Sequence, residues 1–188
     1  MFGYTAYERK VISLLALVAC AFLLRGWLAH VHEGMQFAAE VRIEARPDQV
    51  WEFIAQPGER TGWHAGMISI LPLSEFQAGI GARSLVLYRD NRAVIELEET
   101  VMKFTPPVLW SVTQEAEAFT TEIEITLSAT GAASLVTYRE RKVLRGFFDR
   151  YIAPWLRWKG QRRLAHSMKR LKLMAERQEI EVRPAGPE

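Results

Sequence analysis

Hydrophobic residues change their spacing along this chain, and the changes divide it into an apolar segment, a strand-rich region and a helical end. Residues 11–24 carry no charge and a single hydroxyl, on Ser13. Between residues 36 and 143, apolar and polar positions mostly alternate, which is typical of strands with one buried face. Between residues 146 and 178, apolar side chains recur every three or four positions, which indicates an amphipathic helix.

The apolar segment is long enough to cross a membrane when its flanks are included. A hydrocarbon core of ~30 Å needs about 20 helical residues. Tyr7 and Trp27 flank the apolar run, and both side chains favour the boundary between lipid and water. Arg25 lies near the end of the run, where its charge can reach the headgroups. We therefore expect an N-terminal tail, residues 1–7, and one transmembrane helix, residues 8–31.

Two other interpretations of the apolar segment remain open. Basic Arg9 and Lys10 before an apolar run are typical of a cleaved secretory signal, although no clean cleavage site follows. Residues 17–20 resemble a lipobox that ends at Cys20, the only cysteine of the chain, but residues 21–24 stay apolar after it. As an anchor, the segment predicts a bacterial inner-membrane protein. The basic residues before the span slightly favour a periplasmic domain.

The strand-rich region predicts about seven antiparallel strands and one or more short helices. Pro47 suits the first position of a helix over residues 48–55, and residues 56–58 end that helix. The chain then turns through Trp63 into the next strand. The predicted strands cover residues 36–45, 67–73, 83–89, 93–104, 108–115, 119–127 and 134–143.

The C-terminal helix is predicted to lay an apolar stripe against this sheet. The stripe contains Phe148, Ile152, Trp155, Leu164, Met168, Leu171 and Ala175. Pro154 predicts a kink or a new helix start, and residues 179–188 are expected to be a flexible tail. A curved sheet against one long helix is an α+β arrangement, and the space between them favours a pocket.

Several local motifs occur in a recognisable order. Residues 39–51 combine a first strand, a small residue–proline–acid turn and Val50-Trp51 at the start of a helix. Trp63, the turn at residues 79–83, the break at Pro106-Pro107 and the turn at residues 130–131 follow. Over residues 36–178 this order resembles the SRPBCC superfamily, whose START, pollen-allergen and polyketide cyclase/dehydrase members share the helix-grip fold.

The resemblance implies a curved antiparallel sheet of about seven strands around a long C-terminal helix, with a hydrophobic cavity between them. Members of the superfamily bind lipids, sterols, polyketides, quinones or plant hormones, and some are enzymes. We expect aromatic and apolar side chains to converge on this cavity, although each of them could equally be ordinary core. These candidate ligand-binding residues are Trp51, Trp63, Trp110, Tyr138, Phe148, Ile152 and Trp155.

Residues with catalytic chemistry are few. His64 lies in the region that forms the cavity mouth in relatives, and a histidine there could act as an acid or a base. Arg83 is a second weak candidate, and Arg83, Tyr88, Glu98 and Arg139 could each point inward or pair across strands on the outer face. The sequence has no recognised metal-ligand spacing, phosphate loop or serine nucleophile motif, so we expect no metal or cofactor.

Charge adds one further expectation. The formal net charge is +2, but residues 139–177 are rich in Lys and Arg, whereas residues 93–127 are rich in Glu. The basic helix is either a solvated face or a surface that lies near anionic lipid. No nucleic-acid recognition motif accompanies the charge, so nucleic acid is not an expected partner.

Three functions are compatible with these observations. The first, which we favour, is a membrane-anchored domain that binds or transfers a hydrophobic small molecule such as a lipid, quinone or polyketide. The second is a cyclase/dehydrase-like enzyme, which requires polar groups such as His64 or Arg83 to meet inside the cavity. The third is an accessory subunit of a membrane complex, which predicts a collapsed cavity and a large exposed apolar patch.

Overall fold

The structure is a computed structural model of the 188-residue chain. It describes residues 6–32, 34–76, 78–90, 93–145 and 153–182. Internal contacts divide the chain into two units, Met1–Gly34 and Met35–Glu188, and each is described by itself.

The first unit contains the helix α1, which spans Ala6–His32. Its apolar side chains between Lys10 and Leu24 are exposed. In the part of the chain that the structure describes, no helix combines the length and the hydropathy that a membrane crossing needs. The helix over residues 8–31 is thus present, but its predicted membrane-spanning role is not supported. The predicted inner-membrane location and periplasmic side stay predictions.

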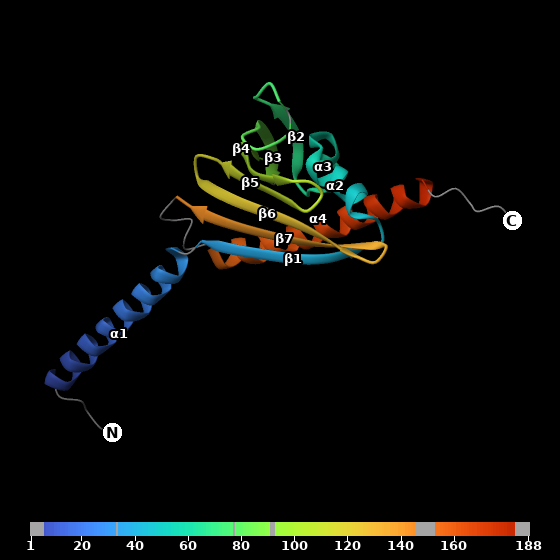
Figure 1. Cartoon of the computed structure of the whole chain (residues 1–188). Coiled ribbons are helices and arrows are strands. Elements are labelled where there is room, and N and C mark those ends of the chain that lie inside the picture. Colours follow the sequence, from blue (N-terminus) through green and yellow to red (C-terminus); the bar gives the residue numbers. More distant parts are fainter. Residues whose placement is uncertain (1–5, 33, 77, 91–92, 146–152, 183–188) are drawn as a thin grey trace. The chain divides into compact units, whose positions relative to one another are not determined.

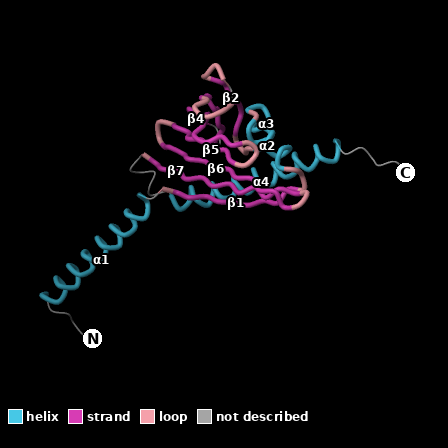
Figure 2. The backbone as a smooth tube through the Cα atoms, viewed as in Figure 1, coloured by secondary structure: helices cyan, strands magenta, loops and turns pink. Residues whose placement is uncertain are grey.

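The second unit is built on a seven-stranded antiparallel sheet with the order β1-β7-β6-β5-β4-β3-β2, and Figure 2 shows its strands side by side. The first strand, β1, therefore pairs with the last strand, β7, whereas all other neighbours are consecutive in the chain. The strands are β1 (Met35–Ile43), β2 (Met67–Pro72), β3 (Arg83–Asp90), β4 (Ala93–Thr105), β5 (Leu109–Glu115), β6 (Phe119–Thr130) and β7 (Ala133–Leu144).

Among the described residues of this unit, three helices accompany the sheet: α2 (Pro47–Ala55), α3 (Pro57–Trp63) and α4 (Ala153–Val182). Pro47 and Pro57 stand at the starts of α2 and α3, where a missing backbone N–H is tolerated. α3 lies where the sequence analysis expected a turn through Trp63, and it is the second of the short helices. α4 begins at Ala153, next to Pro154, and continues past the predicted end at residue 178.

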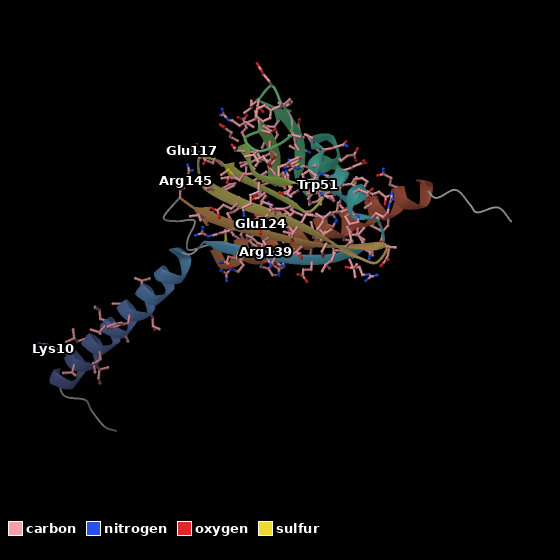
Figure 3. All side chains as sticks on the ribbon, in the orientation of Figure 1. Lys10, Trp51, Glu117, Glu124, Arg139 and Arg145 are labelled. Atoms are coloured by element: carbon pink, nitrogen blue, oxygen red, sulfur yellow. The ribbon has the colours of Figure 1, made fainter. Side chains whose placement is uncertain are left out.

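The two faces of the sheet follow the predicted alternation. In β7, Val136 and Tyr138 are buried, whereas Arg139 is exposed. Figure 3 labels Arg139 and Glu124, which project from the neighbouring strands β7 and β6, and their charged groups lie 3.9 Å apart. The inner face therefore receives the apolar side chains, and ion pairs cover the outer face.

The core lies between the inner face of the sheet and α2, α3 and α4. α4 runs along the sheet next to β1 (Figure 1). It buries Leu164, Met168, Leu171 and Ala175, which confirms this part of the predicted apolar stripe. The chain therefore has the expected α+β helix-grip architecture.

Candidate functional site

A cavity of about 460 Å³ lies between one end of the sheet and the N-terminal half of α4. Pockets for small molecules commonly measure ~300–1,000 Å³. Its apolar walls come from Met35, Phe37, Ile95, Leu97, Phe119, Ile123, Leu144 and Leu156. Its polar lining residues include His64, Tyr88, Gln114, Glu140, Lys142 and Arg163. The cavity contradicts the collapsed interior that an accessory subunit predicts.

His64 is the centre of a buried hydrogen-bonding cluster in this cavity. It follows α3 directly, and its side chain is only 6% exposed. The Tyr88 hydroxyl lies 2.5 Å from Nδ1 and 3.0 Å from Nε2 of the His64 ring. The Tyr138 hydroxyl lies 3.4 Å from Nε2 of His64 and donates to Glu140 Oε2 at 3.3 Å. Four side chains that can exchange protons, those of His64, Tyr88, Tyr138 and Glu140, thus meet at one place.

Two cationic side chains lie close to Oε1 of Glu140, the carboxylate oxygen that Tyr138 does not contact. Lys142 Nζ lies 3.5 Å from Glu140 Oε1, and Arg163 Nη2 lies 3.3 Å from the same atom. The Glu140 side chain is 4% exposed, so the carboxylate is nearly cut off from solvent. A single negative charge is therefore shared by two positive groups.

The sequence of β7 places three of these residues in the cavity region. Tyr138, Glu140 and Lys142 occupy alternate positions, so all three face inward. α4 supplies Arg163 and, one turn later, Ser167, whose hydroxyl accepts from the Ala65 backbone N–H at 2.9 Å. This bond fixes the segment that carries His64 against α4.

Burial shifts the protonation of the cluster toward uncharged groups. It lowers the pKa of His64 well below the usual range, and the nearby Arg163 and Arg60 guanidinium groups lower it further. Burial raises the pKa of Tyr88 and that of Tyr138, and the Glu140 carboxylate adds to the effect on both. At neutral pH the cluster therefore presents a neutral imidazole and two neutral phenols.

A second buried group connects α3 to the sheet beside the cavity. Arg60 donates two hydrogen bonds to Glu99, at 2.7 and 2.6 Å, and Gln114 donates to the same carboxylate at 2.8 Å. The Arg60 guanidinium also lies 4.5 Å from the centre of the Trp110 ring. This network holds α3, and hence His64, in place over β4 and β5.

The predicted tryptophans mostly belong to the core and do not line the cavity. Trp51 packs edge-on against Phe104, with ring centres 5.6 Å apart, and Figure 3 shows it at α2. Trp63 donates its indole N–H to the Phe53 carbonyl at 2.7 Å, and Trp110 lies under Arg60. They pack among the short helices and the sheet, and their contact with a ligand stays a prediction.

The other predicted ligand contacts have different positions. Tyr138 is fully buried and reaches the cavity cluster through His64 and Glu140. Trp155 is 55% exposed and does not line the cavity. Phe148 and Ile152 lie outside the described residues.

The structure separates the two catalytic candidates. His64 lines the cavity, whereas Arg83 is exposed and donates to Glu98 across strands at 2.8 Å. Arg83 and Glu98 therefore pair with each other on the outer face, and Arg139 pairs there with Glu124. Of the four strand residues that could have pointed inward, only Tyr88 lines the cavity.

Glu140, Lys142 and Arg163 were missed by the sequence analysis. The signal for the first two was the alternation that starts at Tyr138, because an inward Tyr138 places both on the same face. Among the described residues, no three or more His, Cys, Asp or Glu side chains are grouped so that they could hold a metal ion.

Solved structures with the same fold include three informative neighbours. The Zhui aromatase/cyclase from a Streptomyces species has a TM-score of 0.66 at 16% identity, over 81% of this chain and 98% of that chain. A START superfamily protein from Mycobacterium smegmatis has a TM-score of 0.64 at 11% identity, over 77% and 99%. A Thermus thermophilus protein has a TM-score of 0.66 at 14% identity, over 76% and 98%.

Sequence comparison adds the family. No curated protein matches the chain significantly. The sequence profile of a family described as polyketide cyclase / dehydrase and lipid transport matches residues 35–176, which is most of the second unit. The chain therefore belongs to the polyketide cyclase/dehydrase and lipid transport family.

Proposed function

We propose that this chain binds an apolar small molecule in the cavity between the sheet and α4. The observation that carries the proposal is the composition of the cavity lining, which combines apolar walls with a cluster of polar side chains around His64 and Glu140. Small-molecule sites have this composition, because apolar walls supply affinity and a few polar groups orient the ligand. The family's description, which includes lipid transport, supports the same function.

Burial of the ligand supplies the binding free energy. Each square ångström of apolar surface removed from water contributes about 25 cal/mol before the costs of ordering are subtracted. Phe37 and Phe119 contribute large apolar surfaces to the walls. The ligand is therefore expected to be mostly hydrocarbon or aromatic.

A cavity-filling variant tests binding directly. Leu144 lines the cavity, so Leu144→Trp should fill part of it and weaken binding of the uncharged dye Nile red about tenfold. Leu173→Trp makes the same change on an exposed position of α4 and should leave dye binding unchanged. Native mass spectrometry of the full-length protein should find a co-purifying apolar molecule in the control variant but not in Leu144→Trp. Equal dye binding by both variants would contradict the proposal.

A second candidate function is a cyclase/dehydrase-like reaction on the bound molecule. Its supporting observation is the contact of neutral His64 with the Tyr88 hydroxyl. In a dehydration, His64 would accept a proton from the carbon next to a carbonyl and return it to a departing hydroxyl, which leaves as water. A tyrosine hydroxyl would donate to the enolate oxygen that forms between these steps.

Turnover and binding separate the two candidates. For the enzyme, His64→Gln should abolish water loss from a β-hydroxy ketone probe, measured by absorbance of the conjugated product, while Nile red still binds. His166→Gln, on an exposed position of α4, should leave the reaction unchanged. Absence of turnover in the unaltered protein, together with dye binding, leaves binding alone as the function.

A further inference from the structure

We infer that the ligand of this cavity carries one negatively charged oxygen group, a carboxylate or a similar oxyanion, on its apolar body. This inference rests on the proposed binding function and adds the chemical class of the ligand's head group. The head group would lie between Lys142 of β7 and Arg163 of α4, which both line the cavity.

The charges that line the cavity do not balance. Asp90 and Lys159 form an ion pair with each other, which joins the end of β3 to α4. Glu140 contacts both Lys142 and Arg163, and the Asp90 carboxylate acts on both of them from a longer distance. His64 is neutral, so the charged lining residues are four cations, Arg89, Lys142, Lys159 and Arg163, and two anions, Asp90 and Glu140, and the lining has an excess of positive charge.

The way in which Glu140 is shared shows where an additional oxygen would bind. Both cations approach Oε1 of Glu140, at 3.5 and 3.3 Å, and Oε2 accepts from Tyr138. Lys142 and Arg163 are multiple donors, and both distances are long for charged hydrogen bonds. A second oxyanion between them would shorten and complete these interactions, because the Lys142 and Arg163 side chains are only 16% and 33% exposed and share one carboxylate oxygen.

An unpaired hydroxyl provides an independent observation at the same level of the sheet. Thr121 is 1% exposed, and within the described part of the chain its Oγ1 has no hydrogen-bond partner. In the strand register Thr121 lies between Gln114 on β5 and Lys142 on β7, which both line the cavity. Buried hydroxyls are rarely left without a partner. An oxygen atom bound beside Lys142 would give the Thr121 hydroxyl an acceptor.

The surrounding walls restrict the rest of the ligand. Phe119 lies next to Lys142, with the ring centre 4.5 Å from the ammonium nitrogen, and Ile123 and Leu97 also line the cavity. These side chains offer no partners to hydroxyl groups. The expected class is therefore an amphipathic acid with one charged end and a mostly apolar body.

A matched set of competitors tests this inference on the full-length protein. Dodecanoic acid, dodecanol and dodecylamine share the same chain and differ in the head group. Each competes with Nile red, whose fluorescence reports the occupied cavity. We expect the acid to displace the dye at about tenfold lower concentration than the alcohol, and the amine to be the weakest competitor.

Variants locate the origin of the preference. Lys142→Gln and Arg163→Gln should each reduce the advantage of the acid over the alcohol to about twofold or less, with the alcohol unchanged. Glu140→Gln keeps the side-chain shape and removes the competing carboxylate, so it should increase that advantage. Lys103→Gln removes the same charge from an exposed position on β4 and should behave as the unaltered protein does.

The outcomes separate this inference from the function on which it rests. Equal displacement by acid and alcohol would overturn the head-group inference while dye binding still supports the cavity as a binding site. An acid preference that survives in both neutralised variants would also overturn it. If no competitor displaces the dye, the proposed binding function fails, and the inference fails with it.

Discussion

The hydroxyl of Tyr88 lies within hydrogen-bonding distance of both ring nitrogens of His64, at 2.5 Å from Nδ1 and 3.0 Å from Nε2. The two residues come from different elements, β3 and the end of α3, and both are buried. Because burial favours the uncharged form of each, the contact joins a neutral imidazole to a neutral phenol. It therefore stabilises the fold and also places a proton donor beside a base.

Removal of the Tyr88 hydroxyl should show how much its contact with His64 contributes to the free energy of unfolding. Tyr88→Phe leaves a buried His64 nitrogen without its nearest partner, so we expect the free energy of unfolding to fall by about 1–3 kcal/mol. Tyr138→Phe removes hydroxyl contacts of 3.4 and 3.3 Å and should cost less. Urea unfolding followed by circular dichroism measures both, and a larger loss in Tyr138→Phe would contradict the assigned geometry.

Acidification should destabilise the protein through His64. Its pKa in the folded state lies well below the unfolded value of about 6.5, so the unfolded chain binds the additional proton as the pH falls through that range. We expect the free energy of unfolding to decrease between about pH 7 and pH 5, by up to ~1.4 kcal/mol per pH unit from this group. Above about pH 7, His64 is neutral in both the folded and the unfolded state, so this loss of stability is absent.

Two histidine variants test the source of this dependence. His64→Gln removes the titrating group and should flatten the profile of unfolding free energy between pH 7 and pH 5. His166→Gln changes an exposed histidine and should keep the slope of the unaltered protein. A slope that persists in His64→Gln would mean that another group controls acid stability.

The stability of the fold should depend strongly on both partners of the buried ion pair between Arg60 and Glu99. Arg60→Met leaves the Glu99 carboxylate buried without its cation, and we expect a loss of about 3–5 kcal/mol in the free energy of unfolding. The double variant Arg60→Met with Glu99→Met should recover much of that loss, because the isolated charge is then gone.

An exposed pair provides the matched comparison. Arg83→Met breaks the pair with Glu98 on the outer face, where both side chains are about half exposed. Such pairs contribute about 1 kcal/mol or less. If chemical unfolding gives equal losses for Arg83→Met and Arg60→Met, then Arg60 does not act as a buried anchor of α3.

Close contact between α4 and β1 should make Gly160 sensitive to a single methyl group. A Cβ at this position would lie 2.5 Å from Cε1 and 2.8 Å from Cζ of Phe37. Overpacking costs about 1–3 kcal/mol, which outweighs the ~1 kcal/mol that alanine contributes to helix propensity. Gly160→Ala should therefore lower the melting temperature and, since Gly160 and Phe37 line the cavity, also weaken Nile red binding.

Two further variants check this explanation. Phe37→Leu in the Gly160→Ala background should restore part of the melting temperature, because the smaller side chain makes room for the methyl group. Gly62→Ala places its Cβ 2.6 Å from the terminal methyl of Met174, which can move, so a smaller loss is expected there. A stabilised Gly160→Ala variant would disprove the tight contact.

The strands and the long helix were predictable because their patterns are regular, and α3 was not. The α3 segment contains Pro57, Gly58 and Gly62, which all lower helix propensity. Tertiary contacts override that propensity: Arg60 binds Glu99, and the Trp63 indole binds the Phe53 carbonyl. Neither contact can be predicted from local sequence, since their partners lie on other elements.

The candidate site was predictable only in part for a similar reason. His64 and Tyr138 stand out as residue types that often form sites. Residues 139–142 read Arg-Glu-Arg-Lys, and such charged runs normally lie in solvent. Because Glu140 and Lys142 alternate with outward residues in step with the buried Tyr138, they lie on the inner face of β7. The sequence does not show that Arg163 of α4 contacts Glu140 there.

The pairing of β1 with β7 has a consequence for how the binding site comes into existence. The wall at Met35 and Phe37 is among the earliest parts of the second unit to leave the ribosome, and Lys159 and Arg163 are among the latest. Hence the cavity of a nascent chain is not complete until synthesis is nearly finished. Fragments that lack β1 or α4 are expected not to retain a ligand.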